Sequence, residues 1–187
     1  MTISPAIQAY WDQERREIIE HIRRFGVHLV YVSNEVGEEC TCCAYLRSVG
    51  AERDPVPTED TPERPPFCYT VGLYGIGHPE LLVIGMERDA CGTVLNALSG
   101  AIHAGTDLVP GEQLSVGGTE LLVEELPNPG QILFDANGFY ERPPMASLPA
   151  LQLTWADGRG RFPWEEGHES GPWPQPRPGE FRADLPG

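Results

Sequence analysis

The chain has 187 residues, enough for one domain, and its charge is strongly asymmetric. It carries 28 acidic residues against 13 basic ones, all arginine, for a formal net charge of -15 at pH 7. Because affinity for nucleic acids comes largely from cationic side chains, this charge argues against DNA and RNA as partners. It also disfavours anionic membrane surfaces, and no apolar run approaches the roughly 20 residues of a spanning helix. The sequence therefore predicts a soluble protein.

The N-terminus and the cysteines indicate a reducing compartment. The opening MTISPAIQAYW has neither a cationic start nor an uninterrupted apolar core followed by a small-residue cleavage site. Five cysteines are an odd number, and three of them crowd into positions 40–43, where mutual disulfides would be strained. Reduced thiols are the simpler expectation. Together with the absence of lysine beside many arginines, alanines, glycines and prolines, this favours a bacterial, cytoplasmic protein.

The first third of the chain predicts a helix, a strand and an irregular insertion. Apolar residues recur at helical spacing after a Ser-Pro start and before Gly26, which predicts an amphipathic helix over residues 5–25. Residues 27–33, VHLVYVS, are β-branched and aromatic, as in a strand. Residues 50–66 combine acids with many prolines and no periodicity, so we expect a mobile acidic insertion there.

The rest of the chain predicts strands around one further helix. Apolar and smaller residues alternate after Phe67, as in a half-buried strand, and residues 81–86 form a continuous apolar run typical of a strand buried on both faces. Residues 87–105 have apolar positions three or four apart, which predicts a second helix. Further strands are predicted on both sides of Gly117-Gly118, in QILFDA at 131–136, and in LQLTWADGRGRFPW at 151–164, which turns at Asp157-Gly158.

This order of elements predicts an α+β fold. Runs of strands without regularly alternating helices favour an antiparallel or mixed sheet, open or partly closed as a barrel, packed by two main helices. We expect a single domain over residues 1–165. Residues 166–187 are rich in Pro and Gly with little to bury, and we expect a loosely ordered tail there.

The segment Gly75-Ile76-Gly77-His78-Pro79-Glu80 joins two apolar strand-like runs. Two glycines widen the backbone conformations available, and the proline restricts the histidine before it. A stiffened His78 two residues from Glu80 is a candidate catalytic acid/base pair, or a pair that orients a ligand. The alternative is a turn whose His and Glu hydrogen-bond the neighbouring backbone.

A second candidate site lies near the C-terminus, where two tryptophans bracket two arginines and an aspartate. This mixture is suited to binding a planar or anionic ligand, or a peptide. The alternative is a hairpin closed by cross-strand aromatic packing, with the aspartate satisfying the turn. The candidate ligand-binding residues are Trp155, Asp157, Arg159, Arg161 and Trp164.

The cysteine cluster is a weaker candidate, for metal binding. Cys40, Cys42 and Cys43 offer thiolates, which are good zinc ligands. Structural zinc sites, however, use two ligand pairs with wider internal spacing, so free or redox-reactive thiols are the alternative. Cys68 and Cys91 fall on apolar positions and are interpreted as packing residues.

Several segments together resemble one protein family. YTVGL at 69–73, HPELLVIGM at 78–86 and LQLTWADGRGRFPWEEG at 151–167 are similar to the bacterial family described as domain of unknown function 4262. The resemblance extends over approximately residues 20–168. It implies a bacterial, cytoplasmic, stand-alone domain with no established activity to transfer, and the cysteine cluster and Pro-rich insertion depart from its pattern.

These observations favour a binding domain. The hypothesis is a cleft built from the 75–80 joint and the 155–164 hairpin, binding a small molecule or a protein partner with basic patches. The alternative is an enzyme handling a small metabolite or a flavin on a split-barrel-like fold, with His78 and Glu80 in proton transfer. No cofactor is specified by any motif.

Overall fold

The computed structural model describes residues 5–33 and 64–183, and its first element is a long helix. Helix α1 spans Pro5–Phe25, which confirms the predicted limits. Gly26 ends it with φ of 82°, a left-handed conformation that favours glycine, and its amide donates to the carbonyl of Ile22 at 2.8 Å. The chain then enters strand β1, His28–Val32.

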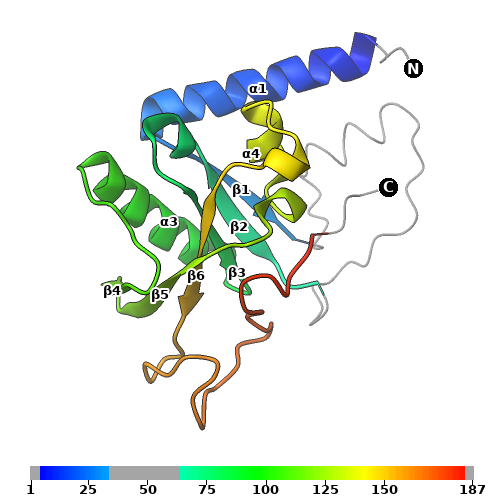
Figure 1. Cartoon of the computed structure of the whole chain (residues 1–187). Helices are drawn as coiled ribbons and strands as arrows, with labels where there is room; N and C mark the ends of the chain where they lie inside the picture. The colour runs from blue at the N-terminus through cyan, green and yellow to red at the C-terminus, as the bar shows by residue number, and fades with distance from the viewer. Residues whose placement is uncertain (1–4, 34–63, 184–187) are drawn as a thin grey trace.

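The described residues form one mixed sheet of six strands in the order β1-β2-β3-β6-β5-β4 (Figure 1). Only the β3–β6 pair is parallel, and the other neighbours are antiparallel. The sheet is open, with β1 and β4 at opposite edges, so the partly closed barrel is wrong while the α+β class is confirmed. The remaining strands are β2 Phe67–Val71, β3 Glu80–Ile84, β4 Gln113–Val116, β5 Thr119–Glu125 and β6 Ala150–Trp155.

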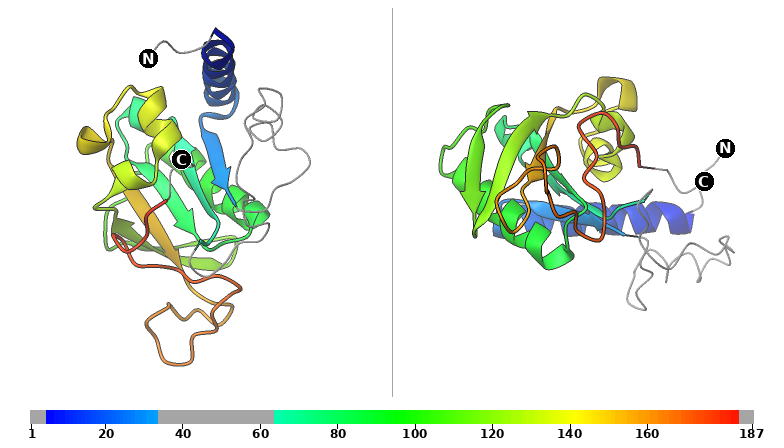
Figure 2. Two further views of the ribbon diagram at one scale, coloured as in Figure 1. Left: turned by 90° about the vertical axis from the view of Figure 1, so that its right-hand side faces the viewer. Right: turned by 90° about the horizontal axis from the view of Figure 1, so that it is seen from below.

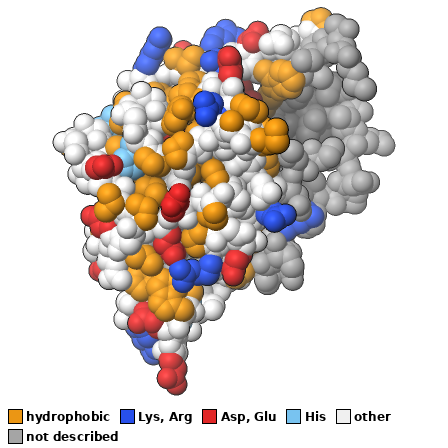
Figure 3. All heavy atoms as spheres, in the orientation of Figure 1, with side chains coloured by type: hydrophobic (Ala, Val, Ile, Leu, Met, Phe, Trp, Pro, Cys, Tyr) orange, Lys and Arg blue, Asp and Glu red, His pale blue; other side chains and the backbone are white. Residues whose placement is uncertain are grey.

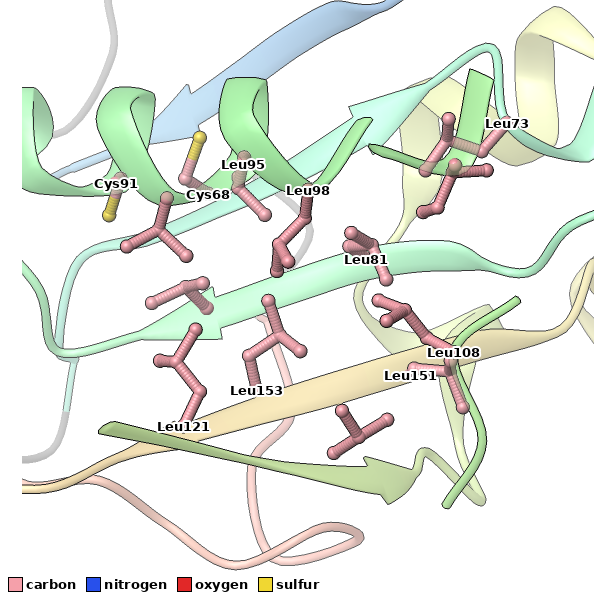
Figure 4. Close-up of a cluster of buried hydrophobic side chains, with 14 of the residues drawn as sticks. Cys68, Leu73, Leu81, Cys91, Leu95, Leu98, Leu108, Leu121, Leu151 and Leu153 are labelled. Carbon is pink, nitrogen blue, oxygen red and sulfur yellow. The ribbon is translucent and has the colours of Figure 1, made fainter. Parts of the chain in front are cut away.

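Helix α3, Arg88–His103, packs on one face of the sheet. Its spacing turns Cys91, Leu95 and Leu98 toward the strands, where they meet side chains such as Leu81 and Leu153 (Figure 4). All five are at most 5% exposed. This burial of a continuous apolar stripe is the main contribution of α3 to stability.

The opposite face is covered by α1 and by the short helix α4, Phe134–Phe139 (Figure 2). Ile18 of α1 and Ala136 of α4 contribute buried side chains to this second apolar cluster. Because both faces are covered, every residue of β2 and of β3 is buried. The prediction of a doubly buried third strand is confirmed, and the prediction of a half-buried strand after Phe67 is wrong.

Two predicted strands are absent from the described residues. QILFDA at 131–136 lies in a 3₁₀ turn and the start of α4, because a short apolar run is compatible with either a buried helix or a strand. After β6 the chain turns at Asp157-Gly158 but does not return as a second strand. Three 3₁₀ turns complete the described structure: Tyr74–Ile76, Pro129–Gln131 and Pro144–Ala146.

The tail predicted to be loosely ordered, residues 166–187, makes specific contacts over its described part. The Gln175 side chain accepts from the amide of Trp155 and donates to its carbonyl, both at 2.9 Å. Phe181 packs edge-on against Phe67 with ring centroids 5.2 Å apart. These contacts place the tail against the sheet and the second apolar cluster.

The surface carries charges of both signs among apolar side chains. On the face in Figure 3, hydrophobic side chains form a band with acidic and basic ones scattered beside it. Among the described residues, no helix has the length and apolar character needed to cross a membrane.

Candidate functional site

The Glu80 carboxylate is fully buried and holds the joint together. Its Oε1 accepts the amides of Gly72 at 2.8 Å and Tyr74 at 3.0 Å. Its Oε2 accepts the Thr70 hydroxyl at 2.6 Å and the Leu73 amide at 3.3 Å. Burial raises the pKa of Glu80, while these hydrogen bonds act in the opposite direction. Both carboxylate oxygens are therefore occupied by the protein's own donors.

His78 is also turned inward, with 5% of its surface exposed. Its Nδ1 donates to the carbonyl of Pro79 at 2.7 Å, and its Nε2 accepts the amide of Leu108 at 3.2 Å. Asp107 Oδ1 lies 3.8 Å from the same Nε2. The neutral ring protonated at Nδ1 satisfies both backbone contacts, so His78 fastens the loop after α3 to the joint.

Asp157 organises the second candidate region in a similar way. Oδ1 accepts the amides of Arg159 at 2.8 Å and Arg161 at 3.0 Å, and Oδ2 accepts the amide of Glu169 at 2.9 Å. The Arg161 guanidinium adds a bond from Nε to Oδ2 at 3.1 Å. The hydrogen bond from Glu169, followed by those from the arginines, lowers the pKa of Asp157. The aspartate thus closes the loop on itself.

The other predicted residues in this region have partners as well. Arg159 pairs with Glu169 at 3.0 Å, and the indole Nε1 of Trp155 donates to the carbonyl of Ile84 at 3.1 Å. Trp164 is 48% exposed and stacks on Phe162 with centroids 5.0 Å apart. The Arg177 guanidinium lies 4.3 Å above the Trp164 ring. The region is a folded loop with one accessible aromatic face, which the arginine partly covers.

The two predicted regions do not face each other. Glu80 pairs with Ala150 in the parallel β3–β6 register, so the joint lies where these strands begin. Trp155 and the loop after it lie where β6 ends, about 15 Å farther along at the rise of a strand. Figure 1 shows the joint at the top of the sheet and the loop after β6 at the bottom. The predicted shared cleft is therefore wrong.

The cysteine cluster, Cys40, Cys42 and Cys43, lies outside the described residues. Within residues 5–33 and 64–183, no group of three or more His, Cys, Asp or Glu side chains is arranged to hold a metal ion. Cys68 and Cys91 are buried, unbridged thiols. A hydrogen bond to Cys91, together with burial, raises the pKa of Cys68, so the Cys68 thiol stays protonated.

A groove lies between α3 and the edge of the sheet, where sequence reasoning placed no site. Its volume is about 590 Å³. Strands β1 and β2 provide its floor, and the first turns of α3 provide its wall. We call it the α3 groove; it is lined by Leu29, Tyr31, Cys68, Arg88, Asp89, Gly92, Thr93 and Asn96.

The α3 groove combines an apolar floor with a polar wall. Leu29 and Tyr31 pack on the apolar cluster beneath α3, and the Arg88 guanidinium lies 5.6 Å from the centre of the Tyr31 ring. Asp89 stands beside Arg88, so the lining carries one charge of each sign although the chain is strongly acidic. Gly92 keeps the wall open, because an added Cβ there meets no atom of another described segment within 4 Å.

Only one signal in the sequence could have pointed to this groove. Gly92 interrupts the helical pattern of α3 near its start, where an alanine would stabilise the helix more. The contribution of Leu29 and Tyr31 depends on the pairing of β1 with β2 and on the placement of α3. Neither can be read from local sequence.

The comparisons with known proteins identify a family. The family model described as Domain of unknown function (DUF4262) matches residues 21–169, which confirms the resemblance, and the chain belongs to this family. The match includes both carboxylates, Glu80 and Asp157, and all residues of the α3 groove. Neither the curated proteins nor the solved structures gave a match.

Proposed function

We propose that this DUF4262 protein binds a small organic molecule in the α3 groove. The supporting observation is the groove itself, whose volume of about 590 Å³ falls in the range of small-molecule sites. Three separate elements, β1, β2 and α3, line it. The residues first predicted as a site, His78, Glu80 and Asp157, have their polar atoms engaged by the protein itself.

The lining specifies the chemistry of the ligand. Leu29, Tyr31 and Cys68 present an apolar floor that suits an aromatic or aliphatic body. Arg88 and Asp89 at the wall can bond a polar group of either sign, and their charges balance. The expected ligand is a neutral or zwitterionic molecule with a flat apolar part.

Filling the groove tests the proposal. Gly92→Phe puts a ring into the groove from a helical position where the backbone accepts any residue. Within the described part of the chain, no neighbouring atom lies within 4 Å of the added Cβ. Gly100→Phe is the matched control, because Gly100 is also in α3, equally open, and outside the lining. The probes are a library of neutral and zwitterionic aromatic fragments, screened by ligand-observed NMR.

The expected result is that fragments binding the wild type bind Gly100→Phe equally and lose at least tenfold in affinity for Gly92→Phe. Both variants should remain folded, since phenylalanine is a better helix former than glycine. Equal affinity of all hits for both variants would refute the groove as the site. A library without a single hit for the wild type would also count against it.

A further inference from the structure

Two histidines make direct contact where α1 joins the sheet. His21, in the last turns of α1, and His28, the first residue of β1, have their Nδ1 atoms 2.7 Å apart. The ring centroids are 4.9 Å apart with an angle of 20° between the planes, so the rings lie nearly edge to edge with their Nδ1 atoms pointing at each other. The tight turn at Gly26 brings the two side chains together.

This contact depends on the number of protons that the pair carries. A hydrogen bond between two Nδ1 atoms needs one ring to donate and the other to accept. The accepting ring must therefore lack a proton on Nδ1. Protonation of both rings places two N–H groups against each other and brings two cations into contact, which removes the bond and adds repulsion.

The charged groups that act on His28 from outside the pair come from α1 and α4. Glu17 on α1 and Asp135 in the first turn of α4 both favour protonation of His28. Asp135 is itself bound by the hydroxyl of Tyr69 on β2, at 2.7 Å. Partial burial and the neighbouring His21 outweigh the two carboxylates and lower the pKa of His28. The fold thus keeps His28 neutral at pH values where an exposed histidine already takes up a proton.

Other contacts within the described residues also hold α1 to the domain. Ile18 is buried in the second apolar cluster and Ile22 packs against it. Arg15 donates to the carbonyl of Phe139 at 2.8 Å and stacks over its ring. Trp11 is 48% exposed on the first half of the helix. The histidine pair adds to these contacts at the C-terminal end of α1.

We propose that the His21–His28 pair is a pH-sensitive contact that fastens the C-terminal half of α1 to β1 at neutral pH and loosens it under mildly acidic conditions. The sign follows from linkage. The pKa of His28 is lower in the folded protein than the ordinary histidine value of about 6.5. The contribution of the pair to stability is therefore complete above pH 6.5 and is lost as the pH falls below that value. Acidification thus frees α1 while the sheet, held by its apolar clusters, stays folded.

NMR of the histidine rings tests the pair in the native protein without a variant. At pH 7.5, nitrogen-detected ring spectra should show one of the two residues protonated at Nδ1 and the other not. During acidification His28 should titrate below the ordinary histidine range. Titration of His28 at the ordinary histidine value would overturn the proposal.

Hydrogen exchange tests the consequence for α1. In the wild type, exchange of the α1 amides, corrected for intrinsic rates, should become about fivefold faster between pH 7.5 and 5.5, as expected for one lost hydrogen bond. His21→Gln, at an exposed position, should remove this extra pH dependence. His103→Gln is the control, because His103 contacts the same turn through the carbonyl of Gly26 yet leaves the pair intact. An unchanged pH dependence in His21→Gln would refute the proposal.

Discussion

The two ends of the β3–β6 pair each contain a buried carboxylate that accepts four hydrogen bonds, yet their pKa values move in opposite directions. Glu80 receives only neutral donors in a fully buried position, and burial raises its pKa. Asp157 also bonds a guanidinium, in a loop near solvent, and its pKa is lowered. The comparison shows that motif carboxylates can organise loops, and that the balance between burial and hydrogen bonding sets the direction of their pKa shifts.

Removing the Glu80 carboxylate should have the largest effect. Glu80→Gln turns an acceptor oxygen into an NH₂ group facing backbone amides, and we expect the free energy of unfolding to fall by about 3 kcal/mol or more. Urea denaturation measures this loss. Glu125→Gln, an exposed carboxylate at the end of β5, is the control and should change stability little. A similar small loss for both variants would show that the four bonds contribute nothing net.

Thr70 separates the contribution of one donor from the rest. Its hydroxyl donates to Glu80 at 2.6 Å and accepts the amide of Leu81 at 2.8 Å. Thr70→Val keeps the shape of the side chain but leaves the Glu80 carboxylate and the Leu81 amide without this partner. The free energy of unfolding should therefore fall by about 2 kcal/mol. The same substitution at half-exposed Thr119 provides the reference in thermal or urea unfolding. Equal effects would mean that the buried hydroxyl is dispensable.

At the other end, Asp157→Asn should act locally and more weakly. Amide protection should fall in residues 157–169 while the strands keep theirs, because the carboxylate bonds only its own loop. In the wild type, the amides of this loop should lose their protection as the pH falls below about 4. The pKa of Asp157 is lower in the folded than in the unfolded protein, so its carboxylate stabilises the loop only above the unfolded pKa. NMR-detected exchange checks both, and loss of protection in the whole sheet would contradict a local role.

The smallest effect is expected at the tip of the joint. The Tyr140 hydroxyl accepts the amide of exposed Gly75 at 3.1 Å. Tyr140→Phe should lower the free energy of unfolding by about 0.5–1 kcal/mol. Burial raises the pKa of this tyrosine to about 12, so an ultraviolet titration of the variant should lose a tyrosine step near pH 12. A loss comparable to that of Glu80→Gln would show that the tip, and not the carboxylate, organises the joint.

Much of the fold was accessible from local patterns. The limits of α1 follow from its periodicity and from the glycine after Phe25, and the turn at Gly117-Gly118 separates β4 from β5 as expected. Residues 131–136 were misread because a short apolar run has no period of its own. The open sheet depends on which strands become edges, and that choice is made by long-range pairing.

The candidate site shows where local reasoning ends. For His78 and Glu80, the alternative of a turn that bonds its own backbone describes the contacts found. The cleft required the start of β3 and the end of β6 to meet, which antiparallel pairing would achieve. These strands are parallel, which sends the two segments to opposite ends. The α3 groove forms only where three segments distant in the sequence converge, and the spacing of residues within one segment does not predict that convergence.

Gln175 has a consequence for association with other chains. Its amide group bonds the backbone N–H and C=O of Trp155, as a residue on a neighbouring strand would. The Gln175 side chain thereby replaces the hydrogen bonds of a neighbouring strand at the end of β6, which extends beyond the residues that pair with β3. A peptide that added a strand to the sheet at this position would have to displace the Gln175 side chain from Trp155. The tail therefore competes with intermolecular strand addition.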